Sequence, residues 1–130
     1  MIPKWIRPLF IVAALYDIVL GAAYLVFYPA LYARFGVALP NLPGYVQLNA
    51  LLVLIMGFGF WMVAGAPVRN RDLITLGTAF KAAYAGIVFL YWARGLMPSM
   101  WLIWAACDTL FLIAFLLARG ALPKARPADA

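Results

Sequence analysis

The amino-acid sequence predicts an all-α protein, a single domain over residues 1–122 in which four transmembrane helices form a bundle. Of the 130 residues, 68% are hydrophobic and only 11% are charged, and the mean hydropathy is +1.00. A soluble domain has about 45–50% apolar and about 25% charged residues, so this chain carries more apolar surface than a domain of its length can bury. Four stretches reach the length of about 20 apolar residues that crosses a bilayer core about 30 Å thick.

The predicted spans are residues 8–27, 45–65, 72–93 and 100–118. Lys4 and Arg7 precede the first span, as basic residues do in a signal peptide. Its apolar run is too long for the hydrophobic segment of a signal peptide, however, and no small-residue cleavage site follows it. We therefore expect this segment to be retained as the first helix.

The segment between the first and second spans predicts a short amphipathic helix at the membrane interface. Large apolar side chains recur through residues 28–35, with Arg34 among them, and Gly36 follows the pattern. The other connections, residues 66–71 and 94–99, are shorter and contain Pro or Gly, which favour turns. Residues 123–130 are predicted to be a disordered cytoplasmic tail.

The basic residues outside the spans predict the orientation of the bundle. Seven of them fall on the side of the two termini and only two on the other side, and cytoplasmic loops carry the excess of Lys and Arg. With an even number of spans, both termini are expected in the cytoplasm. The sequence thus predicts a multi-pass protein of a bacterial inner membrane, with membrane lipids as its first partners.

Three charged residues lie close to the centres of predicted spans: Asp17, Lys81 and Asp108. A central Asp or Lys costs about 2.5–3.5 kcal/mol on membrane-insertion scales, and such residues nearly always face the bundle interior and pair with one another. Because their depths are similar, we expect the three side chains to meet, with Lys81 within about 4 Å of at least one carboxylate.

A cavity that opens outward is expected above this cluster. Helical spacing puts one set of polar and aromatic residues on the same faces as the charges, and an amide lies one turn inside the outer end of the second span. The expected lining residues are Asn49, Tyr24, Thr78, Tyr84, Trp101, Trp104 and Phe111. With two Asp and one Lys, an isolated cluster would carry a net charge of −1. Either a carboxyl group holds a proton, a cation or a ligand ammonium completes the site, or water enters.

Several chemistries are disfavoured by composition. The chain has no His, no Glu and a single cysteine, Cys107, so the usual ligands for haem, zinc, di-iron and dithiol centres are missing. We expect no cofactor, no metal and no catalytic residue. The ten Lys and Arg do not gather into one basic face, so nucleic acid is not expected as a partner despite the net charge of +6.

Several short motifs extend over most of the chain: Tyr16-Asp17 with Gly21, Leu39-Pro40-Asn41, Val46-Gln47-Leu48, the spacing from Gly77 to Lys81, and Cys107-Asp108. Together they resemble a group of small bacterial four-helix membrane proteins that are loosely DoxX-like. That resemblance implies an accessory membrane protein near quinone or sulfur redox chemistry, with the redox centre held by a partner. More distantly, the architecture is similar to the sterol-isomerase and sigma-2-receptor (EXPERA) superfamily, whose His and Glu residues this chain lacks.

Three functions follow as expectations. The first is binding of a small hydrophobic or lipid-like ligand above the Asp–Lys–Asp cluster. The second is an accessory subunit or assembly factor, with a partner membrane protein or a second copy of the chain, in which the cluster only fixes helix register. The third is a proton-coupled exporter resembling the small multidrug-resistance transporters, although Lys81 would neutralise the carboxylate that must bind a cation. A wide hydrated cavity favours the first or third, and a tightly packed cluster favours the second.

Overall fold

Four long helices make up the computed structural model, which describes residues 1–124. They are α1 (Ile6–Arg34), α2 (Pro43–Gly65), α3 (Arg71–Ala93) and α4 (Leu102–Ala121), and a 3-10 turn, η1 (Ser99–Trp101), precedes α4. In this part of the chain 79% of the residues are helical and none lies in a strand. The predicted all-α, four-helix architecture is confirmed. Of the predicted disordered tail, residues 125–130 lie outside the described residues.

Each of the four helices is long and apolar enough to cross a membrane, if η1 is counted with α4. Large apolar side chains cover the outer faces of the helices: Val19, Leu110 and Leu117, for example, are more than 60% exposed. A continuous exposed apolar surface of this kind is unfavourable in water and favourable in lipid. These features indicate a multi-pass membrane protein.

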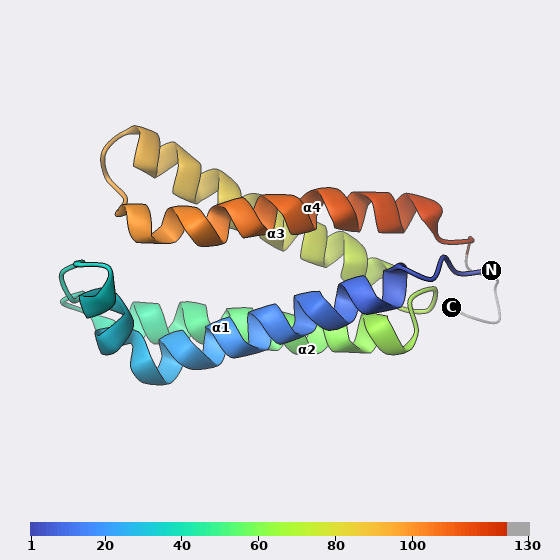
Figure 1. Cartoon of the computed structure of the whole chain (residues 1–130), viewed down its shortest axis with the longest axis horizontal. Coiled ribbons are helices and arrows are strands. Elements are labelled where there is room, and N and C mark those ends of the chain that lie inside the picture. Colours follow the sequence, from blue (N-terminus) through green and yellow to red (C-terminus); the bar gives the residue numbers. More distant parts are fainter. Residues whose placement is uncertain (125–130) are drawn as a thin grey trace.

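The bundle consists of two hairpins, α1 with α2 and α3 with α4 (Figure 1). Two glycines let the backbones of α1 and α2 come very close. A Cβ atom on Gly21 would lie 2.7 Å from the carbonyl oxygen of Ala50, and one on Gly57 would lie 2.9 Å from the backbone nitrogen of Ile18. Small residues at such contacts are how helices pack tightly in lipid, where no hydrophobic force joins them.

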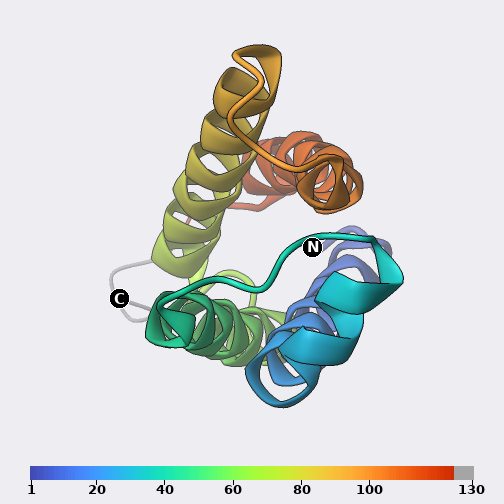
Figure 2. The ribbon, with the colours of Figure 1, turned by 90° about the vertical axis from the view of Figure 1, so that its left-hand side faces the viewer.

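A kink divides α1 near its end. Phe27 has a non-helical backbone (φ −112°, ψ 19°) and Pro29 follows it inside the helix. Proline lacks the N–H that would bond the preceding turn, and its ring clashes with the carbonyl four residues earlier. The two helical turns that follow, residues 28–34, point in a new direction (Figure 2). The short helix predicted over this segment is therefore continuous with α1 beyond a kink.

The end of the bundle that holds the N-terminus and the end of α4 is closed by aromatic rings. The rings of Phe10 and Phe115 stack with centroids 4.7 Å apart, and Phe60 meets Phe115 edge-on at 4.9 Å. All three side chains are fully buried. At the same end, the Arg71 guanidinium donates hydrogen bonds to the carbonyls of Leu122 and Pro123, which ties α3 to the end of α4.

The opposite end of the bundle is more open. Seen from that end, α3 diverges from α2, so the two hairpins separate toward the loops at residues 35–42 and 94–98 (Figure 2). Gly36 and Gly95 adopt the left-handed conformation there, with φ of +67° and +72°, in the turns that end α1 and α3. We call this the loop end, and the end with the three phenylalanine rings the closed end.

Candidate binding site

The three intramembrane charges meet midway between the two ends. The Lys81 ammonium donates hydrogen bonds to Asp17 Oδ1 at 2.7 Å and to Asp108 Oδ1 at 2.8 Å. Asp17 and Lys81 are at most 1% exposed, and Asp108 is 5% exposed. The sequence prediction that Lys81 pairs with at least one carboxylate is confirmed, and it pairs with both.

The cluster joins the two hairpins. Asp17 comes from α1, whereas Lys81 and Asp108 come from α3 and α4. The Lys81–Asp108 pair is therefore internal to one hairpin, and the Lys81–Asp17 pair links it to the other. In the described part of the chain these are the two salt bridges, so a single ion pair connects the hairpins.

Aromatic rings surround the ammonium group as well. The Nζ atom of Lys81 lies 5.2 Å from the ring centroid of Tyr16, 5.3 Å from that of Phe111 and 5.7 Å from that of Phe60. At these distances a ring face attracts a cation, and the attraction is stronger where water is absent. The rings of Phe60 and Phe111 belong to the packing of the closed end, so they separate the ammonium from that end.

One carboxylate oxygen of the cluster has no partner. Asp17 Oδ2 is buried and makes no hydrogen bond within the described residues, and the buried hydroxyl of Tyr16 is in the same situation. A buried polar atom without a partner costs about 1–3 kcal/mol. With two Asp and one Lys, the three side chains have a formal net charge of −1 when all are ionised. A donor on a water, a cation or a ligand would satisfy this oxygen once the side chains that cover it move aside.

A small cavity with a volume of about 20 Å³ borders the cluster on the side of the loop end. That space holds about one water molecule. Of the seven lining residues that the sequence predicted, the structure places five around this cavity: Asn49, Tyr24, Tyr84, Trp101 and Trp104.

Thr78 and Phe111 lie one turn deeper, on the side of the closed end. The Thr78 hydroxyl donates a hydrogen bond to the Ile74 carbonyl, 2.8 Å away. Phe111 packs against Tyr16 and Phe115. Both residues share a helix face with a cluster charge, as their spacing indicated. They lie on the other side of that charge along the helix axis, which spacing alone does not reveal.

The sequence reasoning missed two parts of the wall. Helix α2 contributes apolar side chains, Val46, Ala50 and Val53, at spacings of four and three that mark one helix face. Across the cavity, Trp104 Nε1 donates a hydrogen bond to the Tyr24 hydroxyl at 2.9 Å. This pair links α4 to α1, and no local sequence signal connects two residues that are 80 positions apart.

Among the described residues, no group of three or more His, Cys, Asp or Glu side chains could hold a metal ion. Comparison of the chain with models of protein families, with curated proteins and with solved structures finds no match.

Proposed function

We propose that this protein binds a small hydrophobic or lipid-like ligand in the cavity between its two hairpins, with the Asp17–Lys81–Asp108 cluster as the polar floor. The observation that carries the proposal is the unpartnered Asp17 Oδ2 beside a cavity whose other walls, apart from Asn49, are aromatic and aliphatic. Binding sites for small molecules combine a mostly apolar wall with a few polar groups that fix orientation.

The asymmetry of the bundle supports binding in one half of it, the half nearer the loop end. The rings of Phe10, Phe60 and Phe115 fill the closed end, whereas the cavity lies toward the loop end. An exporter would need a path past these rings, and its substrate would have to displace Lys81 from a carboxylate. In a bacterial inner membrane with cytoplasmic termini, as the basic residues favour, the cavity would face the outer leaflet.

Binding can be tested with the purified protein in phosphatidylcholine nanodiscs. The probes are dodecylammonium, dodecanol and dodecanoate, which share one chain and differ in the head group. The matched variant is Val46→Trp, because Val46 lines the cavity at the partly exposed edge of the core, where a larger side chain fills the space. We expect at least one probe to bind saturably to the wild type and not to Val46→Trp. If no probe binds the wild type, ligand binding is excluded.

A second candidate is an accessory subunit in which the cluster only fixes the packing of the hairpins. One observation favours it: Lys81 is satisfied by two carboxylates, and the remaining space holds about one water. The loosely DoxX-like resemblance points to the same role beside a partner membrane protein or a second copy. In that case no probe binds, and replacing all three charges with apolar residues leaves co-purification of the partner unchanged.

A further inference from the structure

The chemistry of the cavity indicates which head group would complete it. The cluster has two carboxylates for one ammonium, and Asp17 Oδ2 lacks a donor. Above it, the rings of Tyr24, Trp101 and Trp104 line the cavity, and ring faces attract ammonium groups. A cation that carries N–H donors satisfies the orphan oxygen and balances the charge. A neutral alcohol could satisfy only the oxygen, and an anion neither.

A second hollow lies on the outside of α1, directly beside the cavity. Its volume is about 230 Å³, and its walls are mostly apolar. Val19, which is 64% exposed, lies on its rim, so the hollow opens on the apolar outer surface of the bundle. Three residues line both spaces: Leu20, Tyr24 and Trp104.

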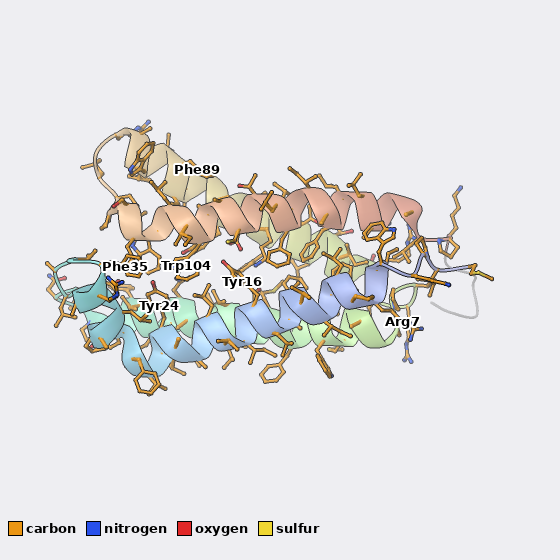
Figure 3. The ribbon with its side chains drawn as sticks, in the orientation of Figure 1. Arg7, Tyr16, Tyr24, Phe35, Phe89 and Trp104 are labelled. Carbon is orange, nitrogen blue, oxygen red and sulfur yellow. The ribbon has the colours of Figure 1, made fainter. Side chains whose placement is uncertain are left out.

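The two spaces share a wall made of Leu20, Tyr24 and Trp104, and the hydrogen bond between Tyr24 and Trp104 joins its two polar side chains. Figure 3 shows both side chains between α1 and α4, next to Tyr16. Helices α1 and α4 pack on each other far less than the helices within either hairpin do. Separation of these two side chains would therefore join the cavity to the outer hollow without disturbing either hairpin.

We propose that the ligand is a single-chain amphiphile with a cationic, hydrogen-bond-donating head group, an alkylammonium in the simplest case, which enters from the bilayer between Tyr24 and Trp104. Its head group donates to Asp17 Oδ2, and its chain lies in the hollow along α1. This inference rests on the proposed function and adds the ligand class and the route of entry.

The first measurement compares head groups on the wild type, so that no variant has to fold. Affinities are measured in phosphatidylcholine nanodiscs by surface plasmon resonance, with empty nanodiscs as the reference. Dodecanol can donate a hydrogen bond to the carboxylate but leaves its charge unbalanced, whereas dodecylammonium adds a close charge pair. Such a pair is worth at least about 1.5 kcal/mol, so dodecylammonium should bind at least about tenfold more tightly than dodecanol. Equal affinities, or tighter binding of dodecanol or dodecanoate, would overturn the assignment of a cationic head group.

Two variants test the contacts. Asp17→Asn should lower the affinity for dodecylammonium to that for dodecanol, whereas Asp72→Asn, which removes an exposed carboxylate from the first turn of α3, should leave it unchanged. Tyr24→Phe removes the oxygen that Trp104 bonds, and the association rate should rise about two- to tenfold, the range expected for one hydrogen bond. An unchanged association rate in Tyr24→Phe would overturn entry from the bilayer between Tyr24 and Trp104. An unchanged affinity in Asp17→Asn would overturn the contact of the head group with that carboxylate.

These outcomes separate the inference from the function on which it rests. If dodecanol or dodecanoate is the probe that binds, and Val46→Trp abolishes its binding, the cavity binds a ligand of another class. In that case only the present inference fails. If none of the three probes binds the wild type, the proposed function fails with it.

Discussion

Lys81 Nζ lies 2.7 Å from Asp17 Oδ1, and this pair is the one salt bridge that joins the two hairpins in the described part of the chain. Both groups are almost completely removed from solvent. A buried charge that loses its partner is not stabilised by solvent. Removing one member of the cluster should therefore lower the stability of the bundle more than removing all three.

Lys81→Met is expected to lower the free energy of unfolding by about 3–5 kcal/mol, because it leaves two buried carboxylates without a cation. The triple variant Asp17→Leu, Lys81→Met, Asp108→Leu should be more stable than Lys81→Met, since it also removes the cost of burying the charges. Chemical unfolding in detergent, followed by circular dichroism, measures both. A triple variant less stable than the single one would contradict this account.

Gly21→Ala should destabilise the α1–α2 hairpin by about 1–3 kcal/mol, the usual cost of overpacking. The added Cβ would lie 2.7 Å from a backbone oxygen, which cannot move aside as a flexible side chain could. Gly59 in α2 is the matched control, because a Cβ there meets nothing within 4 Å. Gly59→Ala should be neutral or stabilising by up to about 1 kcal/mol, and equal losses in the two variants would refute the close backbone contact.

Phe115→Ala should cost about 3–5 kcal/mol, because it empties the centre of the closed end. Phe115 is fully buried and its ring contacts both Phe10 and Phe60. Leu117, two residues further along α4, is 62% exposed and serves as the control, since Leu117→Ala removes no packed interior. Thermal unfolding of the two variants in the same detergent should separate them clearly. Similar midpoints would mean that the rings are not a core.

Reporter fusions test the orientation. Seven basic residues on the side of the termini against two on the other predict cytoplasmic termini. Alkaline phosphatase, which is active only outside the cytoplasm, should be inactive when fused after Ala130 and active when inserted at Asn41. The opposite pattern would invert the bundle and place the cavity in the inner leaflet.

The four helices and the charged cluster could be predicted because each follows from one large energetic term: transfer of apolar residues into lipid for the helices, and pairing of buried charges for the cluster. Twenty apolar residues have few alternatives to a membrane helix, and a buried Lys at the depth of two Asp has few alternatives to pairing. The division of the bundle into hairpins could not be predicted. It depends on how closely backbones approach at Gly21 and Gly57, which is a property of two helices together.

The walls of the cavity were predictable only in part for a related reason. Helical spacing gives the face on which a residue lies, and it correctly grouped Tyr24 with Asp17 and Tyr84 with Lys81. Helical spacing does not give the side of the cluster on which the cavity forms. The prediction therefore placed Thr78 and Phe111 in the cavity wall, although they lie on the opposite side of the charges, toward the closed end.

The contact of the three phenylalanine rings has a mechanical consequence. The backbones of α1 and α2 are in close contact at Gly21 and Gly57, and the three rings join this hairpin to α4 at the closed end, so a rotation of one hairpin against the other would pivot at the rings. Residues at the rings, such as Phe115, would hardly shift, whereas Trp101 at the loop end would move furthest. A small rotation at the rings would therefore produce a larger change in the width of the cavity. The Lys81–Asp17 ion pair would oppose that rotation, because it joins the two hairpins.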